Sequence, residues 1–96
     1  MAHVLWHFEV EDYPRWKSVF DDDPLDRASN GSKGGFVFRS ASDPNEVIVL
    51  LEWDDDKLEQ LRQLNQSPKY KETQERSGYT GTPEVYVLNV DDKPSV

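Results

Sequence analysis

The sequence predicts a single α+β domain with a ferredoxin-like fold, in which a four-stranded antiparallel sheet carries helices on one face. Two observations predict this fold. Four segments rich in β-branched and aromatic residues alternate in polarity, at residues 3–10, 36–40, 46–53 and 84–90. Apolar residues at helical spacing lie between the first and second segments, and again between the third and fourth. The resulting order is β-α-β-β-α(α)-β.

The first half of the chain contains one strand, one helix and a long connection. Residues 3–10 alternate, so that Val4, Trp6, Phe8 and Val10 share one face of the first strand. Asp12 is a suitable N-cap and Pro14 fits a first helical turn, so a short helix follows and ends before Pro24. The next stretch, 24–35, contains three glycines and few apolar residues. We expect this stretch to be a mobile connection.

The second half begins with a hairpin. Its strands are 36–40 and 46–53, joined by a turn that contains Asp43, Pro44 and Asn45. Asp54 then stands at the N-cap position of a helix whose inner face carries Leu58, Leu61 and Leu64. Ser67-Pro68 begins a further helical segment, which Gly78 ends. The domain is expected to span residues 1–90, and 91–96 form a C-terminal tail.

The two faces of the predicted sheet differ in composition. The face expected to meet the helices is almost wholly apolar and consists of Val4, Trp6, Phe8, Val10, Val47, Val49, Leu51, Trp53, Val85 and Val87. The other face mixes apolar and polar residues, and nothing in the same chain covers it. An apolar patch of that kind is rare on a soluble monomer. We therefore expect an isologous homodimer that packs sheet against sheet and encloses a central cavity.

Composition excludes several classes of function. The chain has 96 residues, with 11 basic and 19 acidic side chains, and its net charge is −8. This charge argues against a nucleic-acid partner and against an anionic membrane surface. With no cysteine there is no disulfide framework, thiolate nucleophile or Cys-ligated metal. No apolar run approaches the roughly 18–20 residues that cross a bilayer. We expect a soluble, cytoplasmic protein.

Several stretches of the sequence resemble a known family. They are Val10–Asp21, Val37–Ser40, Asp43–Val47, Glu52–Asp55 and Ser67–Glu72, and together they resemble the antibiotic-biosynthesis-monooxygenase-like branch of the dimeric α/β-barrel superfamily. The resemblance spans about residues 3–90. It implies a ferredoxin-like protomer, a barrel-like dimer and often a small-molecule cavity. It also implies functions that include cofactor-independent oxygenation of aromatic polyketides and cyclase-like chemistry. Leu64 stands where many relatives carry a histidine, so no catalytic residue is carried over.

The candidate site residues come from the mixed face of the sheet. We expect a small, apolar or aromatic ligand in a cavity lined by Leu5, His7, Arg39, Leu50, Glu52 and Tyr86. In an enzyme, His7 is the candidate base, because an imidazole titrates near neutral pH. Arg39 or Tyr86 would stabilise an enolate-like oxygen. No metal, haem or other cofactor is expected. The alternative is a non-catalytic dimeric module that acts in binding or regulation.

Each of these residues also has a structural interpretation. His7 can be a hydrogen-bonded interface residue, Tyr86 can simply pack, and Arg39 can pair with Glu52 across the hairpin. Core packing is the favoured role of the three tryptophans, Trp6, Trp16 and Trp53. The two acidic triplets lack the spacing of a calcium loop, and the glycine-rich run precedes a strand, unlike a phosphate-binding loop.

Overall fold

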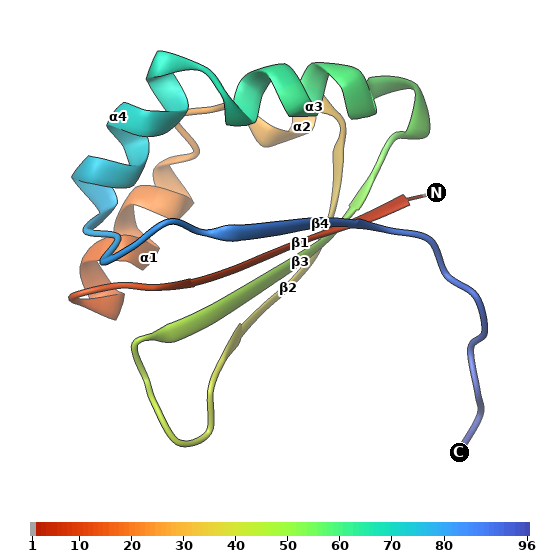
Figure 1. Cartoon of the computed structure of the whole chain (residues 1–96), viewed down its shortest axis with the longest axis horizontal. Helices are drawn as coiled ribbons and strands as arrows, with labels where there is room; N and C mark the ends of the chain where they lie inside the picture. The colour runs from red at the N-terminus through yellow and green to blue at the C-terminus, as the bar shows by residue number, and fades with distance from the viewer. Residues whose placement is uncertain (1) are drawn as a thin grey trace.

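The computed structural model describes residues 2–96 and confirms the predicted fold class. Helices lie on one face of a four-stranded antiparallel sheet with strand order β2-β3-β1-β4 (Figure 1). The elements in chain order are β1 (Ala2–Glu9), α1 (Tyr13–Asp22), α2 (Arg27–Asn30), β2 (Ser32–Arg39), β3 (Glu46–Trp53), the 3₁₀ turn η1 (Asp55–Lys57), α3 (Leu58–Asn65), α4 (Pro68–Ser77) and β4 (Glu84–Leu88).

The predicted helix caps explain where the longer helices begin and end. The Asp12 side chain accepts a hydrogen bond from the Arg15 backbone N–H, and the Ser67 hydroxyl accepts one from Tyr70. Gly78 ends α4 in a left-handed conformation. Asp54 differs from the prediction, because it caps η1 through the Asp56 N–H and α3 begins only at Leu58.

The glycine-rich connection is more ordered than the sequence predicts. Residues 27–30 form α2, and β2 begins at Ser32, so the expectation of a mobile stretch through residue 35 is wrong. The pairing of β2 with β3 is irregular between Ser32 and Gly35. A Cβ on Gly35 would collide with the Leu50 carbonyl oxygen. Gly35 therefore permits close strand pairing here, whereas the sequence predicts a loop.

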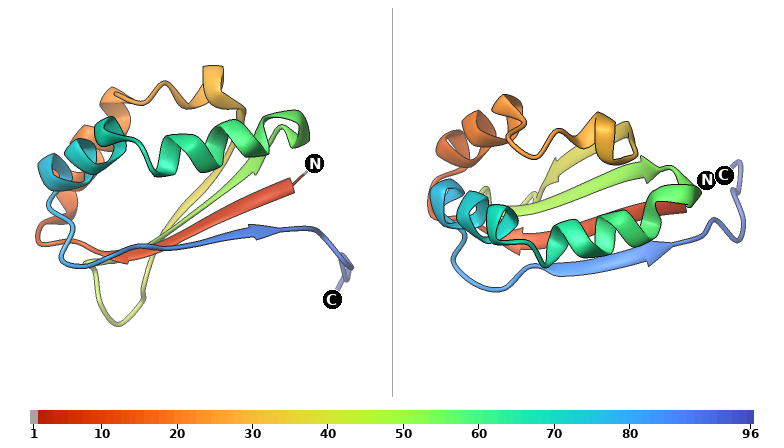
Figure 2. Two further views of the ribbon diagram at one scale, coloured as in Figure 1. Left: turned by 45° about the horizontal axis from the view of Figure 1, so that its top comes forward. Right: turned by 90° about the horizontal axis from the view of Figure 1, so that it is seen from above.

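The hydrophobic core lies between the helices and the central strands β1 and β3. The predicted inward residues of both strands are buried, and Trp16 of α1 and Leu61 of α3 complete the core from the helical side. The prediction is wrong for β4. Val85 and Val87 pair with the inward residues of β1, but they are 37% and 55% exposed. The helices therefore do not cover the edge strand, as the views in Figure 2 show.

The opposite face of the sheet is open and carries a band of apolar side chains. Leu5 at its centre lies beside Leu50 on one side and Tyr86 on the other. Phe36 and Phe38 of β2 stack on each other and are 64% and 48% exposed. We call this surface the open face.

Candidate functional site

Five of the six predicted site residues lie on the open face. Leu5, His7, Leu50 and Glu52 alternate with buried residues along β1 and β3, and Tyr86 of β4 pairs with Leu5. Among them, His7 and Tyr86 are linked through a carboxylate of β4. The Tyr86 hydroxyl donates to Glu84 at 2.5 Å, and His7 Nδ1 lies 3.5 Å from another oxygen of the same carboxylate. The Glu84 side chain is 57% exposed and Tyr86 is 48% exposed, so this group is open to solvent in a single chain.

The other predicted site residue, Arg39, is on the wrong side of the sheet for that site. It pairs with the buried Val47, and its guanidinium lies 3.9 Å from the centre of the Tyr13 ring. The length of the hairpin turn sets this register. Glu52 lies at the far end of β3 and faces His3 at 3.9 Å, so the expected ion pair with Arg39 is also wrong.

A cavity of about 90 Å³ lies instead between the sheet and the helices, on the side predicted to be core. Part of its wall is aromatic and comes from β1, β3, α1 and the segment before β4, namely Trp6, Phe8, Trp16, Phe20, Trp53 and Tyr79. Phe8 stacks on Tyr79 with ring centres 4.4 Å apart, and Trp16 stacks on Phe20 at 5.0 Å. Flat apolar walls of this kind favour a planar ligand.

Helices α3 and α4 supply uncharged polar side chains to the cavity lining. Asn65, Thr73 and Gln74 line it together with Tyr70. The Tyr70 hydroxyl is buried and has no hydrogen bond of acceptable geometry within residues 2–96. Burial raises the pKa of Tyr70, and the polar side chains of Gln74 and Trp6 offset this only in part. Tyr70 is therefore a neutral hydrogen-bond donor at physiological pH, available to a ligand.

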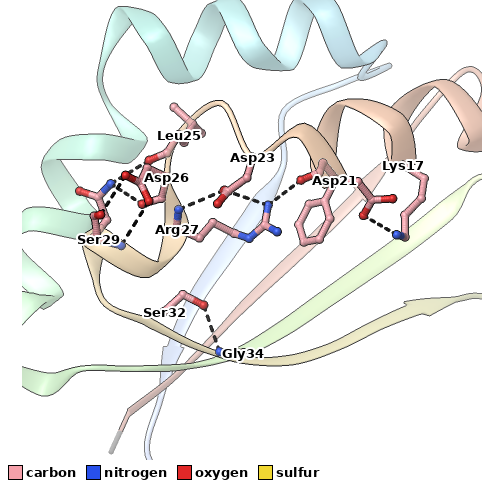
Figure 3. A network of polar contacts seen from close by, with 11 residues as sticks. Lys17, Asp21, Asp23, Leu25, Asp26, Arg27, Ser29, Ser32 and Gly34 are labelled. Carbon is pink, nitrogen blue, oxygen red and sulfur yellow. Dashed lines mark hydrogen bonds and ion pairs between the residues drawn. The ribbon is translucent and has the colours of Figure 1, made fainter.

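The segment between α1 and α2 and the first residue of α2 form the rim of the cavity. They supply the two charged lining residues found among the described residues, Asp23 and Arg27. Arg27 Nη1 donates to the Phe20 carbonyl at 2.9 Å and lies 3.3 Å from Asp23 Oδ1 (Figure 3). The guanidinium carbon is 3.7 Å from the centre of the Phe20 ring. Asp23 and Asp26 both adopt left-handed backbone conformations in this segment, with φ of 51° and 53°.

Within residues 2–96, no group of three or more histidine, cysteine or acidic side chains is placed to hold a metal ion. No helix in the same range is long and apolar enough to cross a membrane.

Comparison with solved structures identifies the fold. The oxygenase SnoaB of Streptomyces nogalater, described as cofactor-independent, superimposes with a TM-score of 0.70 at 18% identity, covering 99% of this chain and 97% of its own. This is the antibiotic biosynthesis monooxygenase fold. A structure described as an antibiotic biosynthesis monooxygenase gives a TM-score of 0.67 at 10% identity, covering 96% of this chain and 100% of its own.

Rv0793 of Mycobacterium tuberculosis has the same fold, with a TM-score of 0.65 at 20% identity and 98% coverage of both chains. No protein-family model matches the chain, and no curated protein matches it. The likeness therefore confirms the predicted resemblance at the level of the fold.

Sequence reasoning missed Tyr70 and the rim residues Asp23 and Arg27. One signal for Tyr70 was present, because it is the single aromatic residue in the otherwise polar α4. No comparable signal marks Arg27, since the predicted loop gave no reason to place its side chain near the core. Core packing is the role that the sequence predicts for the three tryptophans of this wall, because a cavity wall and a filled core have the same periodicity.

Proposed function

We propose that this protein binds a small aromatic molecule in the cavity between the sheet and the helices and promotes its oxidation by molecular oxygen without a cofactor. The observation that carries the proposal is the cavity with its aromatic wall and the Tyr70 hydroxyl, which has no hydrogen-bond partner of acceptable geometry in the described part of the chain. The fold shared with SnoaB is consistent with it. In this proposal Tyr70 donates a hydrogen bond to an oxygen substituent of the ring. A preorganised, buried donor stabilises negative charge that develops on that oxygen.

Ligand entry requires the cavity to widen. Its volume of about 90 Å³ is smaller than the roughly 300–1,000 Å³ typical of ligand pockets. Pro24 and Leu25 form part of the wall on the α1–α2 segment, which lies outside the sheet and contains two left-handed aspartates. We propose that this segment moves outward when a ring enters.

A thermal-shift screen with one-ring and two-ring phenols tests the binding step. A phenol at 100 times its Kd stabilises the native state by about 2.7 kcal/mol, which is readily measured for a domain of this size. The expected result is a shift that Tyr70→Phe reduces. No shift with any phenol, at concentrations up to their solubility, would contradict the proposal.

A second candidate is binding without catalysis. One observation favours it: within residues 2–96 the cavity lining contains no histidine or lysine, and its single carboxylate, Asp23, is paired with Arg27. Measurement of oxygen uptake with a phenol that gives a thermal shift separates the two candidates. Uptake that depends on Tyr70 supports the oxygenase, and binding without uptake supports the binding module.

We also propose that the open face is covered by a second copy of the chain. Phe36, Phe38, Tyr86 and Leu88 are each more than a third exposed, and a soluble protein rarely leaves such a face in water. In this arrangement His7 and Tyr86 lie between the two sheets and act as hydrogen-bonding interface residues. Sedimentation equilibrium should give twice the mass of one chain. Phe38→Lys should give a folded single chain, whereas Lys71→Glu on α4 should not change the mass.

A further inference from the structure

The rim of the cavity contains a cation with unused hydrogen-bonding capacity. A guanidinium has five N–H donors. In Arg27, Nη1 contacts the Phe20 carbonyl and Asp23, and no acceptor within residues 2–96 lies in hydrogen-bond geometry with Nε or Nη2. One edge of the planar group is therefore free.

Arg27 is held in place by contacts that do not use this free edge. The Phe20 ring packs against the guanidinium, and the Phe20 carbonyl and Asp23 hold Nη1. Its side chain is only 29% exposed, so it is largely withdrawn from water. A positioned, partly buried guanidinium binds planar oxyanions well, because little conformational entropy remains to be lost.

Among the described residues, Arg27 is one of two charged residues that line the aromatic cavity. Asp23 is the single other charged residue in the lining. A ligand whose ring lies against the aromatic wall can therefore place one acidic substituent at the rim, next to the guanidinium. The net charge of −8 makes the protein as a whole unfavourable for anions, so selection for an anionic ligand has to come from a local cation.

We propose that the ligand is an aromatic compound bearing a carboxylate, and that Arg27 is the residue that selects it. This inference rests on the proposed function, since it requires a ring in the cavity. The carboxylate accepts hydrogen bonds from the free edge of Arg27 and competes with Asp23 for the guanidinium. Asp23 thus limits the affinity, because its carboxylate already neutralises part of the charge that the ligand would meet.

A matched pair of probes separates the contribution of the aromatic ring to the affinity from the contribution of the charge. We would titrate the full chain at pH 7 with 2-naphthoate and with the neutral, nearly isosteric 2-naphthamide by isothermal calorimetry. Charge-assisted hydrogen bonds contribute about 1.5–3 kcal/mol, so naphthoate should bind at least tenfold more tightly. Arg27→Gln should abolish this preference, and Arg27→Lys should retain part of it, since lysine keeps the charge without the planar donor pair.

Two further variants test whether the effect belongs to Arg27. Lys17→Gln is the control, because Lys17 is a cation on α1 that pairs with Asp21 and does not line the cavity (Figure 3). It should leave both affinities unchanged. Asp23→Asn should increase the affinity for naphthoate about threefold to tenfold and leave that for naphthamide unchanged. Asparagine tolerates the left-handed backbone and keeps the oxygen that accepts from the Arg27 N–H, so this variant should remain folded.

The outcomes distinguish this inference from the proposed function. The selection of a carboxylate would be overturned if the two probes bound with equal affinity. It would also be overturned if Arg27→Gln and Lys17→Gln lost equal amounts of affinity for naphthoate. Either result would leave an aromatic site in place. A failure of Asp23→Asn to strengthen naphthoate binding would count against the competition between carboxylates. If neither probe binds, the aromatic site and its selectivity are both wrong.

Discussion

Replacing Tyr70 by phenylalanine should stabilise the folded protein while weakening its ligand site. A buried polar group without a hydrogen bond costs about 1–3 kcal/mol, and the Tyr70 hydroxyl has no partner of acceptable geometry in the described structure. The nearby polar groups of Gln74 and Trp6 interact with the hydroxyl and reduce this destabilisation in part. We therefore expect Tyr70→Phe to raise the free energy of unfolding by about 1 kcal/mol, and the melting temperature by about 4–8 °C.

Urea unfolding followed by tryptophan fluorescence measures the stability, and titration with a phenol measures the site. Tyr86→Phe is the control, because the Tyr86 hydroxyl is exposed on the open face and its removal should change stability by less than about 0.5 kcal/mol. The phenol should bind about tenfold more weakly to Tyr70→Phe than to the native chain, since a lost hydrogen bond of about 1.4 kcal/mol corresponds to that factor.

A loss of 1 kcal/mol or more in Tyr70→Phe would refute this reasoning. It would mean that the hydroxyl is satisfied in the folded protein and contributes to stability, as most buried tyrosine hydroxyls do. Increased stability with unchanged phenol binding would place the ligand away from Tyr70.

Three further predictions concern the backbone and pH. Gly35→Ala should destabilise the protein by about 2 kcal/mol or more, because its Cβ meets a carbonyl of the neighbouring strand, while Gly81→Ala, with nothing within 4 Å, should be neutral in urea unfolding. Ser67→Ala removes the cap of α4 and should cost about 1 kcal/mol in the same assay. Burial raises the pKa of both Tyr70 and Tyr79 above the usual tyrosine value of 10.0. Above about pH 10 the unfolded chain loses these protons while the native chain keeps them, so urea midpoints should fall with rising pH, and less steeply in Tyr79→Phe.

The fold was predictable because burial in the sheet follows simple alternation. Val4, Trp6, Val49 and Trp53 are buried as their period-two pattern predicts, and the cap at Ser67 begins α4. Strand β2 was not predictable in the same way. Its glycines have no side-chain pattern, and their role depends on a close approach to Leu50 that is determined by the pairing with β3.

The candidate site was less predictable than the fold. Alternation placed His7 and Tyr86 correctly on one face, but Arg39 depended on the hairpin register, and the turn of residues 40–45 sets that register opposite Val47. The cavity itself depends on how closely side chains of β1, α1 and α4 approach each other. Such distances are properties of the packed tertiary structure and have no local sequence signal.

Hydrophobic attraction at the edge strand β4 and repulsion between the net charges of two chains act in opposite directions on self-association. Its apolar side chains are uncovered on both faces, which draws copies of the chain together, whereas the net charge of −8 on each copy holds them apart. Added salt screens the repulsion but leaves the hydrophobic attraction in place. Self-association through this strand should therefore strengthen as ionic strength rises, the reverse of what an assembly held by ion pairs would show.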